Sequence, residues 1–418
     1  MAGAATAENA AAIGTIGASL LTDAFVADPY PTFDRLRELD PVHWSESIGG
    51  WILTRYDDVL ATFKVTTDYS NEGRLGRASE YLDPEARSRL EAFEAHYRTK
   101  GLLHSDPPDH TRLRRLVLRA FSPRVIESMR PRIQQIVDDL LDRVQADGRM
   151  EVIEDLAFAV PVTVLAELLR VPVSHGARFR EWADRLLAFQ GVNKPGEQVL
   201  LAAQQALLEA RAYLTDLIAQ RRRVPGDDLI THMTDTTAAG ESLTDDEIIN
   251  TGITLLTAGH ETTTSLIGNG LFTLLSHPEQ WAEVRRDPAL VKPAIEEALR
   301  YESPVSRQPR LLKHDTELRG KTLRAGQMAF QMLGSANRDP AQFSDPNTFD
   351  IGRSPNRHIA FGQGIHFCIG APLSRTEGEI VFSSILERMP NIGLIDADPV
   401  WDVRKANSRV LRTLPVAF

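Results

Sequence analysis

Helical spacing of hydrophobic residues dominates this chain. Between about residues 107 and 301 the apolar positions recur with the period of an α-helix, with only short breaks. Strand-like alternation is confined to short stretches, Val42–Ser45 and residues 51–54 near the start and others after about Arg310. The pattern therefore predicts a mainly α fold with a small β portion.

Several helix starts carry local signals. Pro107-Pro108 precedes one helical run, and Ser122 followed by Pro123 is typical of the first residues of another. Ser242 or Thr244, followed by three acidic residues, predicts the start of a long helix that runs to about Leu275. This helix is expected to be continuous and central.

The segment from Pro340 to Gly364 is rich in glycine, proline, aspartate and asparagine, which favours turns over helices and strands. Apolar residues are interleaved with these turn signals, so the segment is expected to be ordered and functional; they are Phe343, Phe349, Ile351, Ile359 and Phe361. No linker or internal repeat is visible. We expect a single domain over residues 1–418, with about residues 1–27 as an N-terminal extension.

Composition and charge exclude several classes of protein. The 418 residues are 42% hydrophobic and 25% charged, which is typical of a globular protein and not of a disordered chain. The formal net charge of -10 disfavours binding to nucleic acid or to an anionic membrane surface. No apolar stretch reaches the ~20 residues that a membrane span needs. We expect a cytoplasmic protein with no membrane anchor.

Three partial motifs fail at one position each. A phosphate-binding loop ending at Thr322 would need glycine where Asp315 stands, and a zinc-protease helix starting at His260 would need histidine where Thr264 stands. A dinucleotide fingerprint starting at Gly362 would need glycine where Phe367 stands. None of these three activities is supported.

Cys368 is the single cysteine of the chain, so it forms no intrachain disulfide and no multi-cysteine metal site. It follows two glycines, Gly362 and Gly364, and precedes a helical pattern over residues 369–388. The N-terminus of a helix favours a thiolate over a thiol. Cys368 is therefore a nucleophile, the axial ligand of a haem iron, or a buried structural cysteine.

The segment around Cys368 resembles the haem-binding signature of the cytochrome P450 family. The matching residues are Phe361, Gly362, Gly364, His366, Cys368 and Gly370. The resemblance implies the cytochrome P450 fold, with haem b held between a long central helix and a cysteine loop followed by a helix. It also implies that Cys368 is the metal ligand, a thiolate that favours O–O cleavage.

Residues 258–263 resemble the oxygen-activation motif of the same family and lie in the middle of the predicted long helix. Ala258 and Gly259 share a helix face with Thr262, and their small size leaves room for a macrocycle and O2. The resemblance implies that Glu261 and Thr262 relay protons. By itself, Thr262 is also compatible with an ordinary hydroxyl that bonds back to a helix carbonyl.

Glu297 and Arg300 resemble the Glu-x-x-Arg motif of the family, and Arg353 matches the arginine that joins this pair from the turn-rich segment. The resemblance implies a buried structural network. The spacing alone is also that of an ordinary surface ion pair.

Four cations match the positions that contact the haem propionates in the family. His110 and Arg114 are four residues apart on one predicted helix, Arg310 opens a predicted strand, and His366 lies in the cysteine loop. Each of them alone is compatible with a solvated surface charge.

The resemblance implies a monooxygenase that inserts one oxygen atom from O2 into an apolar small molecule, by hydroxylation, epoxidation or dealkylation. No flavin or nicotinamide motif is present, so electrons from NAD(P)H are expected through a ferredoxin and ferredoxin reductase, or a flavodoxin-like donor. Arg112, Arg115 and Arg375 are candidates for a basic docking patch or are plain surface arginines. The alternatives are a peroxide-driven peroxygenase and a non-catalytic haem- or ligand-binding protein.

The family positions also imply a substrate pocket formed by about residues 75–103 together with Phe189, Leu255, Ala258, Val305 and Val410. These residues are mostly apolar, which suits many classes of compound. The sequence therefore leaves the substrate open.

Overall fold

The computed structural model describes Leu20 and residues 22–418 apart from residues 191, 236, 239 and 406. Most of the expected N-terminal extension lies outside the described residues. Its last part is attached to the body, because Leu20 is buried among Tyr30 and Phe33 and is followed by α2 (Asp23–Ala27). The guanidinium of Arg409 donates to the carbonyl oxygens of the last two residues of α2.

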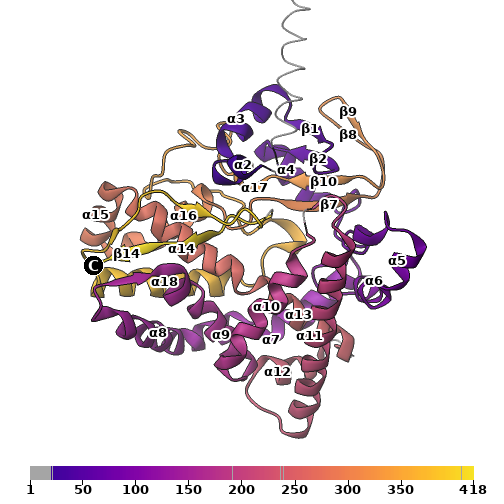
Figure 1. Ribbon diagram of the computed structural model, residues 1–418, viewed down its shortest axis with the longest axis horizontal. Coiled ribbons are helices and arrows are strands. Elements are labelled where there is room, and N and C mark those ends of the chain that lie inside the picture. Colours follow the sequence, from indigo (N-terminus) through magenta and orange to yellow (C-terminus); the bar gives the residue numbers. More distant parts are fainter. Residues whose placement is uncertain (1–19, 21, 191, 236, 239, 406) are drawn as a thin grey trace, which may run out of the picture.

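The main sheet has five strands in the order β1-β2-β10-β7-β3. β2 and β10 are parallel and the other neighbours are antiparallel. Their bounds are β1 (Val42–Ser45), β2 (Gly50–Leu53), β10 (Met328–Gln331), β7 (Gln308–Leu312) and β3 (Tyr69–Ser70). Both strand predictions near the start are confirmed within one residue. Figure 1 shows this sheet at one end of the molecule, beside α3 (Tyr30–Leu39) and α4 (Tyr56–Lys64).

The remaining described strands are short and antiparallel. A three-stranded sheet has the order β11 (Gly393–Leu394), β14 (Pro415–Ala417) and β4 (Arg149–Glu151). The other strands form three pairs, namely β5 (Thr237–Ala238) with β6 (Glu241–Ser242), β8 (Thr316–Leu318) with β9 (Lys321–Leu323), and β12 (Val400–Trp401) with β13 (Leu411–Thr413).

The other regular elements of the described chain are helices, as the hydrophobic spacing predicts. Those before the central helices are η1 (Gly76–Ser79), α5 (Pro84–Ser88), α6 (Glu91–Arg98), α7 (Asp109–Ala120), α8 (Pro123–Gln145), η2 (Ile153–Ala157), α9 (Ala159–Leu169), η3 (Val173–His175), α10 (Gly176–Leu187), α11 (Glu197–Arg223) and α12 (Leu229–Asp235). Those from the central helices onward are α13 (Asp245–Ala258), α14 (Glu261–Leu275), α15 (Pro278–Arg286), η4 (Pro288–Leu290), α16 (Val291–Tyr301), α17 (Leu333–Ala336), η5 (Gly364–His366) and α18 (Ala371–Arg388).

No single helix among the described residues is long and apolar enough to cross a membrane. The stretch from Ile153 to Leu187 meets the length and composition only as two segments bent by 119° at their break.

The largest hydrophobic core surrounds α14. This helix contacts α16 and α18, and α18 in turn contacts α8. Leu266, Ile267 and Leu271 of α14 are buried there together with apolar residues of the neighbouring helices. Burial on all sides explains why α14 carries almost no charge after its first residue. The core fixes α14 and α18 relative to each other, and both lead to the candidate site.

The predicted helix starts are confirmed where local caps exist. The hydroxyl of Ser122 accepts a hydrogen bond from the N–H of Val125, and α8 begins at Pro123. Thr244, rather than Ser242, caps α13, and it forms a capping box with Glu247.

The expectation of one continuous helix to Leu275 is wrong. α13 ends at Ala258 and α14 begins at Glu261, so the helix is interrupted at Gly259 and His260. The imidazole Nδ1 of His260 hydrogen-bonds the carbonyl oxygen of Leu256 at 3.0 Å, which competes with the regular backbone pattern. The hydrophobic spacing runs through the interruption, so periodicity does not reveal it.

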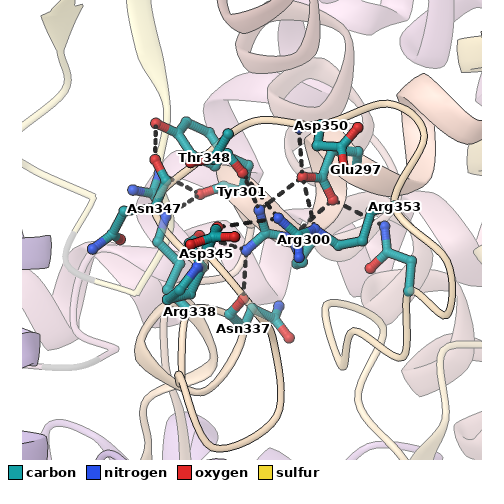
Figure 2. Close-up of polar contacts among 12 residues, drawn as sticks. Glu297, Arg300, Tyr301, Asn337, Arg338, Asp345, Asn347, Thr348, Asp350 and Arg353 are labelled. Atoms are coloured by element: carbon teal, nitrogen blue, oxygen red, sulfur yellow. Dashed lines mark hydrogen bonds and ion pairs between the residues drawn. The ribbon is translucent and has the colours of Figure 1, made fainter.

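The turn-rich segment is confirmed as ordered structure without helix or strand between α17 and η5. Four of its five predicted anchors are buried, namely Phe343, Phe349, Ile351 and Ile359, and the fifth, Phe361, is partly buried. Figure 2 shows the polar network that this segment forms with α16. The segment leads directly into the loop that carries Cys368.

Glu297 and Arg300 form the centre of that network, and both side chains are 0% exposed. All five guanidinium N–H groups of Arg300 are used, two on the carboxylate of Glu297 and three on the carbonyl oxygens of Asn337, Pro346 and Thr348. The remaining acceptor capacity of Glu297 takes the N–H of Asp350 at 2.9 Å. This is a buried network and not a surface pair.

Arg353 and Asn356 complete the network from the turn-rich segment. Their side chains donate to the two carboxylate oxygens of Glu297 at 3.2 and 3.1 Å. The structure thus brings Glu297, Arg300 and Arg353 together, as the sequence predicts.

Replacing Glu297 by glutamine tests this network. Glu297→Gln removes the negative charge and leaves the buried guanidinium of Arg300 uncompensated, so the free energy of unfolding should fall by about 3–5 kcal/mol. Denaturant unfolding of the purified protein measures this change.

The matched control is Glu283→Gln, because Glu283 is an exposed carboxylate on the neighbouring α15. This control should change the free energy of unfolding by less than about 0.5 kcal/mol. A loss below about 1 kcal/mol in Glu297→Gln would show that the network contributes little.

Candidate functional site

A short loop between η5 and α18 presents Cys368. The N–H of Cys368 donates to the carbonyl oxygen of Phe361 at 3.0 Å, and the N–H of Phe367 donates to that of Gly364 at 3.1 Å. These bonds close the loop on itself. α18 begins three residues after Cys368, slightly later than the predicted start at residue 369.

Two glycines allow the loop to lie against α4. Gly362 and Gly364 have φ of +68° and +70°, a backbone region that favours glycine. A Cβ added to Gly364 would collide with the carbonyl oxygen of Phe63, the residue before the last one of α4. Glycine is therefore required at 364 by both conformation and close approach.

The thiol of Cys368 is partly buried and accepts hydrogen bonds from the N–H groups of Gly370 and Ala371. Burial raises the pKa of this thiol above its ordinary value, although the two N–H groups and the charges of Arg114 and Arg375 act to lower it. The expectation that the helix start favours the thiolate is thus only partly met, because burial outweighs it. A bound metal ion removes the thiol proton by its own charge.

The break between α13 and α14 places three predicted residues on a cavity. Ala258, Glu261 and Thr262 line this cavity, whose volume is about 420 Å³. The hydroxyl of Thr262 donates to the carbonyl oxygen of Ala258 at 2.9 Å. Gly259 lies at the break itself, and a Cβ there would meet the carbonyl oxygen of Leu255 at 2.5 Å.

Glu261 has a cationic partner that lies far away in sequence. Its Oε2 lies 2.6 Å from Nζ of Lys405, which also contacts Oδ1 of Asp184 at 2.8 Å. Burial alone would lower the pKa of Lys405, but the carboxylates of Glu261 and Asp184 raise it above its ordinary value. Lys405 therefore stays protonated and links the acid of α14 to α10.

The cavity wall is more polar than expected. Its apolar residues include Leu103, Leu187, Ile253 and Val305, but charged and amide side chains also line it. Of the five residues named individually for a substrate pocket, Ala258 and Val305 line this cavity.

The other three lie elsewhere. Phe189 is buried against Phe93 and Tyr97, Leu255 packs against the main core, and Val410 lines a second, much smaller pocket. Tyr97 lines the cavity, so Phe189 stands behind a lining residue rather than on the cavity wall.

The four predicted propionate contacts converge near the cysteine loop. The rings of His110 and His366 lie 4.2 Å apart, and Arg114 donates from Nη2 to the carbonyl oxygen of Phe367 at 2.6 Å. Arg310 and His366 both line the cavity. Burial, aided by neighbouring positive charge, lowers the pKa of His110 to about 4 and that of His366 to about 3. Both imidazoles are therefore neutral at pH 7.

Polar atoms without a hydrogen-bond partner among the described residues gather at this same end. They include both ring nitrogens of His110, Nε2 of His366, Nδ1 of His104 and Nε of Arg74. Buried polar atoms in folded proteins are almost always paired. This end of the site thus offers donors to a ligand.

Arg74, His104 and Lys405 are lining residues that the sequence analysis did not single out. Arg74 directly precedes the predicted segment 75–103, and His104 directly follows it, so a wider segment would have included both. Lys405 carries no local signal, because its partner Glu261 is 144 residues away.

The three arginines considered for a docking patch are all paired. Arg112 binds Glu247, Arg115 binds Glu241, and Arg375 binds Glu296 through Nε at 2.6 Å and Nη2 at 2.8 Å. Each positive charge is thus compensated by a neighbouring carboxylate, and the three do not form an unpaired basic patch.

Comparison with known proteins gives the family. A sequence model described as cytochrome P450 matches residues 75–169 and 201–390 of this chain. The chain is 41% identical to cytochrome P450 107B1 of Saccharopolyspora erythraea over 88% of its length and 90% of that protein. It is also 41% identical to the cytochrome P450 monooxygenase PikC of Streptomyces venezuelae, with 94% and 92% covered.

Solved structures agree with this assignment. The structure of P450BioI in complex with an acyl carrier protein ligated to hexadec-9Z-enoic acid has a TM-score of 0.86 and 36% identity, with 95% of this chain and 100% of that chain covered. The chain belongs to the cytochrome P450 family, the class of oxidoreductases that its fold and cysteine loop define. Members of this family are haem-containing monooxygenases, so the resemblance seen in the sequence is confirmed.

The residues present fit a haem. One thiol stands on a rigid loop, and unpaired donors with two arginines stand nearby to receive two propionate carboxylates. Cys368 would ligate the iron, and His110, Arg114, Arg310 and His366 would hold the propionates. Phe361, Gly362 and Gly370 would shape the loop.

Substitution of Gly364 tests the cradle of Cys368. Gly364→Ala should force the loop away from Phe63, so the purified protein should retain much less haem per chain and unfold at a lower temperature. Haem content after gel filtration and thermal unfolding measure these effects.

Gly320→Ala is the matched control, because Gly320 has a similar φ of +75° but no heavy atom within 4 Å of an added Cβ. It carries the conformational cost of about 1–2 kcal/mol without the collision. Equal effects of the two substitutions would show that the contact with Phe63 is unimportant.

Proposed function

We propose that this chain is a haem-thiolate monooxygenase that inserts one oxygen atom from O2 into a small molecule, with electrons from an external donor. The observation that carries the proposal is the placement of two motifs around one site. Cys368 stands on a glycine-supported loop, and Ala258, Glu261 and Thr262 line the adjoining cavity. When bound, haem b with a thiolate ligand supplies the chemistry of O2 activation.

The residues of the break between α13 and α14 would handle protons. Thr262 presents a hydroxyl on the cavity wall, and Glu261 next to it is a carboxylate held by Lys405. An alcohol beside an acid can pass a proton toward the cavity at the hydroxyl oxygen of Thr262. The small side chain of Ala258 and the bare backbone of Gly259 leave room beside this hydroxyl.

The cavity supports a small-molecule substrate with an apolar body and some polar groups. Ile253, Leu187 and Val305 would contact the apolar part, and the polar lining would orient the rest. A 6-deoxyerythronolide B hydroxylase and a mycinamicin IV hydroxylase/epoxidase, each 36% identical to this chain, support hydroxylation or epoxidation as the reaction.

Electrons would come from NAD(P)H through a separate donor such as a ferredoxin with its reductase. The face nearest Cys368 is the expected docking site. Because Arg112, Arg115 and Arg375 are paired with carboxylates, we do not assign the docking charges to them.

A peroxide-driven reaction on the same fold is the competing function. Members of this family that act as peroxygenases typically carry Arg-Pro where this chain has Glu261-Thr262. Turnover with peroxide alone, unchanged by an electron donor, would favour the peroxygenase over the monooxygenase.

Replacing Cys368 tests the thiolate directly. Reduced protein with CO should show the red-shifted Soret band characteristic of a haem-thiolate protein, and Cys368→Ala should lose this band because no other cysteine exists. Absorbance spectroscopy of the reduced CO complex measures it. Persistence of the band in Cys368→Ala would reject the assignment.

Replacing Thr262 tests the proton relay. In the presence of a compound that shifts the Soret band, Thr262→Ala should divert reducing equivalents to peroxide several-fold more than the wild type does. The measurement is peroxide formed per NAD(P)H oxidised, with a surrogate ferredoxin and reductase.

Thr257→Ala is the matched control. Thr257 also lines the cavity and donates its hydroxyl to a preceding helix carbonyl, that of Ile253, at 2.9 Å, but it is not the sequence neighbour of Glu261. Coupling should stay near the wild-type value in this control. Unchanged coupling in Thr262→Ala would remove Thr262 from the relay.

A further inference from the structure

Positive charge exceeds negative charge on the cavity wall. Two carboxylates line the cavity, Asp184 and Glu261, and Lys405 binds both of them. The lining residues with a permanent positive charge are Arg74, Arg307, Arg310, Arg404 and Lys405. Arg404 pairs with Asp402, whereas neither Arg74 nor Arg310 forms an ion pair with a described residue.

Arg74 is the clearest example of a cavity arginine without an acidic partner among the described residues. Among the described residues it has no hydrogen bond and no ion pair, and its Nε is buried. The titratable groups that interact electrostatically with Arg74 are Tyr97, Arg310, His104 and His366, and none of them is a carboxylate. A guanidinium has five donors in a planar fork, and leaving them unpaired in a partly buried place is costly.

Arg310 stands beside Arg74 with few contacts of its own. It is 5% exposed, and it donates to its neighbour's carbonyl oxygen, that of Pro309, at 2.9 Å and to the side chain of Gln308 at 3.5 Å. Burial, followed by the charge of Arg74, lowers the pKa of Arg310 to about 9, so both arginines remain charged at pH 7.

The acid nearest to Arg310 does not compensate this pair. Asp106 receives the hydroxyl of Ser70, the N–H of Asn71 and Nζ of Lys313 at 2.7 Å. Asp106 also does not line the cavity. The neighbouring imidazoles of His104 and His366 are neutral, because burial lowers the pKa of both.

We propose that Arg74, together with Arg310, binds a carboxylate at this end of the cavity. A planar guanidinium matches the two oxygens of a carboxylate, and an anion bound near both guanidiniums would offset the repulsion between their charges. Two carboxylates can reach this place, a propionate of the haem and a carboxylate of the substrate. Either source rests on the proposed haem-containing function.

The test uses haem-loaded protein and two measurements. The first is the rate of haem loss to an excess of apomyoglobin, which reports a propionate contact. The second is the dissociation constant for dodecanoic acid and for its methyl ester, read from the Soret shift, which reports a substrate carboxylate. The variants are Arg74→Met, which keeps the stem without the charge, and Arg74→Lys, which keeps the charge without the fork.

If Arg74 holds a propionate, haem loss should be about 5–10-fold faster in Arg74→Met and intermediate in Arg74→Lys. The dissociation constants of dodecanoic acid and of its methyl ester should then change by the same factor. If Arg74 holds a substrate carboxylate, Arg74→Met should weaken the acid about 10-fold but not the ester, with haem loss unchanged. Arg98→Gln is the control, since Arg98 is an exposed arginine on the neighbouring α6; neither value should change.

The proposal is overturned if Arg74→Met matches the wild type in both measurements. Should Arg74→Met fail to hold haem at all, the comparison of Arg74→Lys with the wild type decides, and identical values again overturn it. The CO spectrum of the wild type is recorded separately, so a failure of the haem-thiolate assignment is distinguished from a failure of the Arg74 assignment.

Discussion

The buried ion pair of Glu297 and Arg300 is the constraint on which the rest of this molecule depends. Fully buried charges must be paired and hydrogen-bonded. The backbone after α17 is therefore constrained to place its carbonyl oxygens where they accept from Arg300. Arg300 fixes the carbonyl oxygens of Asn337, Pro346 and Thr348, and the amide of Asn337 in turn accepts the N–H of Ile359. The Cys368 loop starts two residues later. A network whose residues do not line the cavity thereby helps to set the position of the thiol.

At the cavity, by contrast, several buried nitrogens have no hydrogen-bond partner among the described residues. Around Arg300 every donor is used, whereas His110, His366 and Arg74 keep buried nitrogens without partners among the described residues. Buried side-chain atoms without a partner also occur elsewhere among the described residues, such as Oε1 of Gln331 and Oε2 of Glu377. The nitrogens of His110, His366 and Arg74 differ from these because they lie near the cysteine loop, where the propionates of a bound haem would supply acceptors.

The sequence predicts those features that depend on interactions between residues close together in the chain. The caps at Ser122 and Thr244, the buried apolar anchors of the turn-rich segment and the glycines before Cys368 all follow from neighbouring residues. It does not predict the break at Gly259, because hydrophobic spacing continues through it. Nor does it predict the contact of Lys405 with Glu261 or the isolation of Arg74. Those depend on segments that meet only in the folded chain.

Thr262 shows that the position of a threonine, and not a single hydrogen bond, distinguishes a functional hydroxyl from a structural one. Thr257 and Thr262 make the same bond to a preceding carbonyl oxygen, which is an ordinary feature of threonine in helices. What differs is the surrounding backbone and charge. Thr262 is the second residue of the helix that follows the interruption, and its neighbour in the chain is Glu261, whose carboxylate binds Lys405. Thr262 is therefore the one of the two whose chain neighbour is ion-paired with an ammonium group that can supply a proton, and the bond that both threonines share carries no functional information.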